Sequence, residues 1–121
     1  MQLVSVNSSQ DLPLQNNDQH KIHIGASVIC RRTGVIERRG QVEKLRRKEI
    51  DLVTYLYENA ARVVTRDELL SKVWNCSMVV TRTVDQTVAT LRRKLGDDYR
   101  QPQHLITVHG IGYMVRKDPE S

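Results

Sequence analysis

The amino-acid sequence predicts one α+β domain in which short strands come first, three helices follow and a hairpin ends the fold. Three observations lead to this prediction. The length of 121 residues fits a single domain with a modest core. The apolar residues change from partly alternating to helical spacing near residue 46. A Gly-containing turn separates two short β-type runs near the C-terminus.

The chain divides by composition into one domain and two short tails. Residues 1–20 are rich in Ser, Asn, Gln and Asp, as in a flexible tail or the remnant of a linker. We expect the folded domain over residues 21–117 and a short tail over residues 118–121.

The region from Lys21 to Leu45 contains short apolar stretches punctuated by glycine. Ile22 and Ile24 precede Gly25, and similar groups recur up to Leu45. This pattern of apolar residues and glycines is typical of three or four short antiparallel strands joined by tight turns. The sequence therefore predicts a four-stranded N-terminal sheet.

Helical spacing begins after that sheet. The first helix is expected over Arg46–Ala60, with one apolar face and with Asn59 as a left-handed terminator. Residues 62–64 are expected to form a short link. Thr65 is then a suitable N-cap for a second helix through Trp74, and Glu68 stands at the capping-box position.

The third helix is expected over Thr81–Leu95. Four aliphatic residues recur along one side at helical spacing, and the opposite side is small, polar and basic. Thr81 is placed as its cap, Asp85 in its first turn and Gly96 as its stop signal. The aliphatic residues are Val84, Val88, Leu91 and Leu95, and the polar side contains Arg82, Gln86, Ala89, Thr90 and Arg93.

The polar side of this helix has two interpretations. On the helix pattern alone, a solvated outer face of a core helix is the more frequent case. The same side also suits the DNA major groove, where Gln and Arg read base edges and Thr serves base edges or phosphates.

The C-terminal segment predicts a hairpin. Leu105 to Val108 is one β-type run, residues 109–112 form a turn and Tyr113 to Val115 is the second run. Strands, three helices and a terminal hairpin together predict a winged helix-turn-helix, with a four-stranded antiparallel sheet at its N-terminus.

The charge favours a polyanionic partner. The formal net charge is +5 and the isoelectric point is near 9.5, which points first to nucleic acid and second to an anionic membrane. No apolar run is long enough to span a membrane and no signal peptide is visible, so we expect a cytoplasmic protein. Cys30 and Cys76 are read as reduced thiols, although the sequence leaves a single disulfide open.

The sequence predicts no enzyme and no cofactor or metal site. His20 and His23 have the spacing of a helical metal pair, but no nearby Cys or carboxylate completes a site. Gly110 and Gly112 do not precede a helix, as a phosphate-binding fingerprint requires. No Ser-His-Asp or Cys-His pairing has supporting local context.

Several motifs, in order and at the same spacing, give residues 22–116 a specific resemblance to a known family. These motifs are RKEIDL at 47–52, VVTRDELL at 63–70, VW at 73–74, RTVD at 82–85, LRRKLGD at 91–97 and ITVHGIGY at 106–113. On these motifs, the segment Glu49 to Val115 resembles the winged-helix output domain of OmpR/PhoB-type response regulators.

The resemblance implies a role for each matching residue. The third helix would lie in the major groove and the wing would reach the adjacent minor groove, where His109 takes the place of the usual Arg. The expected base-reading residues are Gln86, Thr87, Thr90 and Arg93. The expected DNA-backbone contacts are Arg66, Thr81, Arg82, Thr83, Arg92 and Thr107, and the expected minor-groove residues are His109 and Gly110.

The resemblance also implies partners. We expect double-stranded DNA, a monomer in isolation and a homodimer on DNA, with RNA polymerase contacting the loop Asn75–Val80. The predicted function is sequence-specific DNA binding as a transcription regulator, as the output domain of a two-component response regulator. The alternatives are a winged-helix module that binds a protein, a nonspecific nucleic-acid binder and a stand-alone regulator without phosphorylation control.

Overall fold

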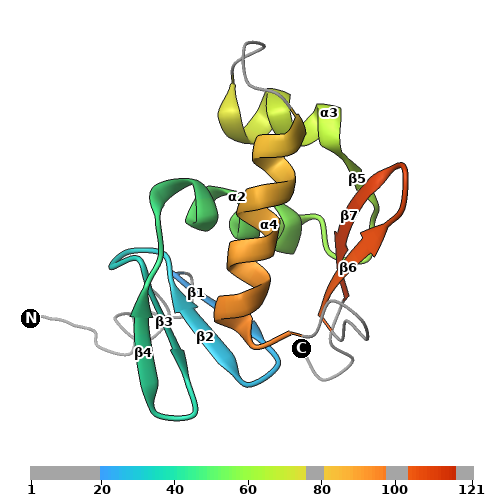
Figure 1. Cartoon of the computed structure of the whole chain (residues 1–121). Coiled ribbons are helices and arrows are strands. Elements are labelled where there is room, and N and C mark those ends of the chain that lie inside the picture. The colour runs from blue at the N-terminus through green and yellow to red at the C-terminus, as the bar shows by residue number, and fades with distance from the viewer. Residues whose placement is uncertain (1–19, 76–80, 98–103, 117–121) are drawn as a thin grey trace, which may run out of the picture.

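A computed structural model describes residues 20–75, 81–97 and 104–116, which form two sheets and three helical segments (Figure 1). The tails predicted at 1–20 and 118–121 lie outside these ranges, apart from His20. The strands are β1 Lys21–Ile24, β2 Ser27–Cys30, β3 Val35–Arg38, β4 Gln41–Lys44, β5 Val64–Thr65, β6 Leu105–Val108 and β7 Gly112–Val115. The helical segments are α2 Arg47–Glu58, α3 Arg66–Leu69 with the turn η1 Leu70–Trp74, and α4 Thr81–Leu95.

The N-terminal sheet is four-stranded and antiparallel in the order β1-β2-β3-β4, as predicted. In β1, Ile22 and Ile24 are buried while Lys21 and His23 are exposed. Because successive side chains of a strand point to opposite faces, the isoleucines face the core and the polar side chains face solvent. β4 is an edge strand, and all four of its residues are exposed.

Helix α2 is slightly shorter than predicted. It begins after Arg46, whose backbone N–H donates to Glu49 Oε1 at 2.9 Å, and Leu52, Val53 and Leu56 on its inner face are fully buried. The predicted left-handed terminator Asn59 is wrong, because Asn59 has φ −113° and the left-handed residue is Ala61 with φ +68°.

The second helix starts as predicted and then changes pitch. Thr65 caps it, since its Oγ1 accepts the Glu68 N–H at 3.0 Å. After the single turn of α3, residues Leu70–Trp74 form a wider π-helical turn that ends at Asn75 with φ +52°. The expected uniform helix through Trp74 is therefore corrected to one α-turn followed by one π-turn.

Helix α4 has the predicted bounds, Thr81–Leu95. Its aliphatic row Val84, Val88, Leu91 and Leu95 is at most 4% exposed, and Gly96 with φ +70° ends the helix. Two details differ from the prediction. Thr81 is the first helical residue rather than the cap, and Asp85 falls in the second turn.

The C-terminal hairpin is extended by a strand that the sequence did not predict. β7 pairs with β6 on one side and with the two-residue β5 on the other, so Val64 belongs to a sheet and not to a link, and the capping residue Thr65 is also part of this strand. Gly112 permits this pairing. A Cβ at this position would lie 1.9 Å from the carbonyl oxygen of Val64.

Candidate nucleic-acid interface

The side of α4 that faces away from the core is a polar and basic ridge. Arg82, Gln86, Ala89 and Arg93 are exposed and follow one another at intervals of four, three and four residues. We call these four residues the outward ridge. The aliphatic row on the opposite side holds the ridge in place because it is buried in the core.

The threonines beside the ridge are half-buried and bonded within the helix. Thr87 Oγ1 donates to Thr83 O at 2.9 Å, and Thr90 Oγ1 donates to Gln86 O at 3.1 Å. Both hydroxyl protons are therefore used inside the helix, which leaves the oxygens as acceptors toward the outside. Thr81 is exposed at the start of the helix.

The Asp85 carboxylate joins α4 to the start of α3 and to the wing. Asp85 Oδ1 accepts from Arg66 Nε at 2.8 Å and from the Tyr113 hydroxyl at 2.5 Å. The Arg66 guanidinium also lies over the Tyr113 ring, 5.1 Å from its centroid. Burial raises the pKa of Asp85, but the hydrogen bonds from Tyr113 and Arg66 outweigh it and leave the pKa below its ordinary value.

Arg92, a predicted DNA-backbone contact, lies inside the fold. The residue is buried, and its Nη2 donates to Leu105 O at 2.7 Å and to Thr107 Oγ1 at 2.9 Å. Its position in the helix turns it toward β6 rather than toward the outward ridge. Arg92 thus attaches the wing to α4, and Thr107 is its half-buried partner.

The wing ends in an exposed turn. His109 and Gly110 are exposed there, together with Ile111, which is 52% exposed. The turn is closed by a hydrogen bond from Ile111 N–H to Val108 O at 3.0 Å. The predicted minor-groove residues therefore stand at the tip of a hairpin that β5 and Arg92 hold in place.

The C-terminal end of α4 is attached to the N-terminal sheet. Lys94 Nζ lies 2.8 Å from Glu49 Oε1 and 3.0 Å from Lys44 O, and the side chains of Lys94 and Glu49 are almost fully buried. This buried ion pair fixes the orientation of α4 relative to α2 and β4. A movement that separated the two side chains would leave an uncompensated charge in the interior.

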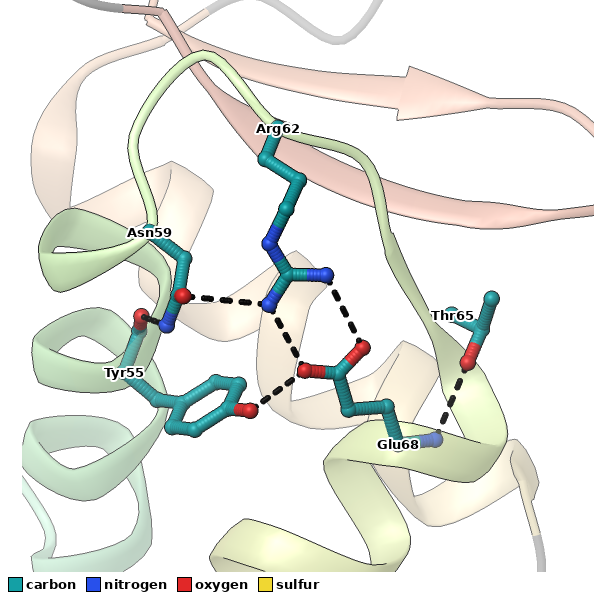
Figure 2. Close-up of polar contacts among 5 residues, drawn as sticks. All are labelled: Tyr55, Asn59, Arg62, Thr65 and Glu68. Atoms are coloured by element: carbon teal, nitrogen blue, oxygen red, sulfur yellow. Dashed lines mark hydrogen bonds and ion pairs between the residues drawn. The ribbon is translucent and has the colours of Figure 1, made fainter.

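A second polar cluster fixes α3 against α2. Figure 2 shows Glu68 between Arg62, which donates to both carboxylate oxygens at 3.2 and 2.7 Å, and Tyr55, which donates its hydroxyl proton. The Arg62 and Tyr55 hydrogen bonds lower the pKa of Glu68 to about 2. The predicted capping box is thus half formed, because the Glu68 carboxylate turns to these side chains and not to Thr65.

The sequence missed Asp85, Tyr113 and Glu43 as parts of this surface. Asp85 and Tyr113 hold Arg66, and Glu43 on β4 pairs with Arg93 at 3.1 Å. Each partner comes from a different element, so helical spacing alone carries no signal for these contacts.

Residues 20–75, 81–97 and 104–116 contain no group of three His, Cys, Asp or Glu side chains that is arranged to hold a metal ion. No helix in this part of the chain is both long and apolar enough to cross a bilayer. Residues 76–80 of the predicted polymerase loop lie outside the described residues.

The fold and the outward ridge define the class of the chain as a winged helix-turn-helix domain. The family model described as "Transcriptional regulatory protein, C terminal" matches residues 40–115. The chain belongs to this family and is a winged-helix output domain of the OmpR/PhoB type.

Individual relatives agree with this family. The sensory transduction protein RegX3 of Mycolicibacterium smegmatis is 42% identical over 82 residues, which are 67% of this chain and 36% of that protein. The chain therefore spans about a third of the length of the curated relatives it matches.

Solved structures of the same fold include one that contains DNA. The DNA-binding domain of Klebsiella pneumoniae RstA, in complex with the RstA box, aligns with a TM-score of 0.68 and 26% identity, over 79% of this chain and 96% of that chain. DrrB of Thermotoga maritima, an OmpR/PhoB homologue, aligns with a TM-score of 0.71 and 25% identity, over 95% and 56% of the two chains.

Proposed function

We propose that this domain binds specific duplex DNA sequences as the output part of a two-component response regulator. The observation that carries the proposal is the outward ridge of α4, with an amide and two guanidinium groups on one exposed helix side. An α-helix fits the major groove, where each base pair presents a distinct pattern of donors, acceptors and methyl groups.

Gln86 is the central base-reading residue of this proposal, with Thr87, Thr90 and Arg93 beside it. A Gln side chain can bond adenine at two positions, and an Arg can bond guanine in the same way. The Thr87 and Thr90 hydroxyls donate to carbonyl oxygens inside the helix. Their oxygens can still accept hydrogen bonds from base amino groups.

Backbone contacts would surround this reading surface. We assign Thr81, Arg82 and Thr83 to phosphates at the start of α4, Arg66 to the phosphate beside α3 and Thr107 to the wing. His109 and Gly110 would enter the minor groove. The net charge of +5 supports these roles, because phosphate contacts supply most of the affinity that does not depend on sequence.

Relatives support the DNA partner and the signalling context. RstA is seen with its DNA box, and RegX3 is a sensory transduction protein. In this proposal, phosphorylation elsewhere in the regulator promotes dimerisation, and two copies occupy adjacent half-sites in head-to-tail order. RNA polymerase would meet the loop Asn75–Val80.

A protein-binding role for α4 has less support. The exposed large hydrophobic residues in the described part of the chain are Val42, Val63 and Ile111, and α4 contributes none of them. A helix that docks on another protein would be expected to expose an apolar patch.

Selection of genomic DNA fragments against competitor DNA tests the proposal. We expect the chain to retain a small set of fragments that share a motif. If about five phosphates are neutralised, log affinity should fall with log salt concentration at a slope of roughly −4 to −5. Equal retention of all fragments would refute sequence-specific binding.

A further inference from the structure

The C-terminal part of the outward ridge carries an ion pair that crosses to the N-terminal sheet. Arg93 Nη2 lies 3.1 Å from Glu43 Oε2, and the two side chains are 64% and 46% exposed. The Glu43 side chain makes no other hydrogen bond or ion pair with a described residue. A carboxylate therefore stands at the rim of a surface that is proposed to meet phosphates.

The strand register places Glu43 on the inner face of the sheet. Glu43 is paired with Ile36, which is 2% exposed, so both side chains point to the side where the core lies. Glu37 and Val42 form the neighbouring pair and point to the outer face. Because Lys94 binds the carbonyl oxygen of Lys44, β4 runs beside the end of α4 and brings Glu43 to Arg93.

We propose that Glu43 is a specificity-determining residue that restrains Arg93 from binding phosphates of random DNA. This inference rests on the proposed function. The pair is exposed, and such pairs are weak enough to exchange when a better partner is present. The Glu43 carboxylate repels an approaching phosphate, because both groups are anionic. The O6 and N7 atoms of a guanine are uncharged acceptors that can bond Arg93 at two positions without this repulsion.

A purely structural role for Glu43 predicts different behaviour. An inward-pointing charge on an edge strand can serve to prevent pairing with another sheet. In that case, removal of the charge would change self-association and leave DNA discrimination as it is. The two roles are therefore separated by DNA binding at several salt concentrations.

The experiment compares the whole chain with Glu43→Gln and with Glu37→Gln on random duplexes and on the preferred duplex selected from genomic DNA. Glu37→Gln removes the same charge from the outer face, where the Glu37 carboxylate has no hydrogen bond or ion pair with a described residue. We expect Glu43→Gln to raise affinity for random DNA about two- to five-fold, to steepen its salt slope by about 0.9 and to lower the ratio of specific to random binding. Glu37→Gln should change the salt slope by much less.

Arg93→Ala, alone and combined with Glu43→Gln, identifies the cause. If Glu43 acts through Arg93, Glu43→Gln should have little effect on the salt slope when Arg93 is absent. An equal effect with and without Arg93, or equal slopes for Glu43→Gln and Glu37→Gln, would overturn the inference and leave the proposed function intact. A wild-type chain that prefers no sequence would overturn both.

Discussion

The Tyr113 hydroxyl on β7 donates a hydrogen bond of 2.5 Å to the Asp85 carboxylate on α4. The same carboxylate oxygen accepts from Arg66, which precedes it by 19 residues, at the start of α3. One oxygen atom thus fixes the relative positions of the wing and the two helices of the helix-turn-helix. These three elements also carry most of the residues proposed to contact DNA.

Tyr113→Phe should test this arrangement with little change in packing. The variant keeps the buried ring and loses a hydrogen bond to a charged group. We therefore expect the free energy of unfolding to fall by about 1.5 kcal/mol. The measurement is the midpoint of urea unfolding, with an unchanged dependence of the unfolding free energy on urea concentration. Tyr57→Phe is the matched control, because the hydroxyl of the half-buried Tyr57 has no hydrogen bond with another described residue. Equal midpoints for the two variants would contradict the role of the Tyr113 hydroxyl.

Gly112→Ala should separate β5 from β7. The added methyl group would lie 1.9 Å from the Val64 carbonyl oxygen, and neither backbone can move without breaking the pairing. We expect a loss of about 3 kcal/mol in unfolding free energy. Gly40→Ala is the comparison, because a methyl group there meets nothing within 4 Å and costs only the strain of φ +82°, about 1 kcal/mol. A larger loss for Gly40→Ala would refute the steric argument.

The Glu68 carboxylate should stabilise the fold at neutral pH, and this stabilisation should be lost at acid pH. Its folded-state pKa of about 2 lies below the ordinary value of 4.5, because Arg62 and Tyr55 bind the ionised form. The stabilisation is therefore complete above pH 4.5 and is lost as the pH falls toward 2. Glu68→Gln should show a smaller loss of stability than the wild-type chain between these two pH values. Asp67→Asn is the control, because the carboxylate of this neighbouring exposed residue has no hydrogen bond or ion pair with a described residue, and the variant should follow the wild-type pH profile.

Local spacing was sufficient to predict most of the fold. The bounds of α4 follow from four aliphatic residues and a terminal glycine, and the N-terminal strands follow from short apolar stretches between turns. β5 was missed because two residues are too few to produce an alternating pattern. Its partner Tyr113 lies 49 positions along the chain from Val64 in the strand register, so only the folded chain brings them together.

The site was less accessible to sequence reasoning than the fold. Helical geometry correctly separates exposed residues such as Gln86 from the buried row, but it says nothing about partners on other elements. Arg92 was expected to contact the DNA backbone because of the family resemblance, which gives no information on its partners inside the fold. Its long side chain instead crosses to β6 and satisfies a backbone carbonyl.

Arg92→Ala should therefore act on stability and not on phosphate binding. Loss of the bonds to Leu105 O and Thr107 Oγ1 should cost about 2 kcal/mol of unfolding free energy. The salt slope of DNA binding, measured well below the unfolding temperature, should stay within experimental error of the wild-type slope. A slope flatter by about one unit, with unchanged stability, would restore Arg92 as a phosphate contact.

Substitution of Gln86 and substitution of Arg82 should weaken DNA binding in two distinguishable ways, although both residues are exposed on the same side of α4. Gln86→Ala should cost about 1–3 kcal/mol on the preferred duplex and little on random DNA, because a base contact is lost and specificity relaxes at that position. Arg82→Ala should weaken binding to both duplexes alike and flatten the salt slope by about one unit, because a phosphate contact is lost. Neither variant touches the buried aliphatic row, so unfolding midpoints should remain close to wild type. Equal losses for Gln86→Ala on both duplexes would remove base reading from this position, and an unchanged slope for Arg82→Ala would remove Arg82 from the interface.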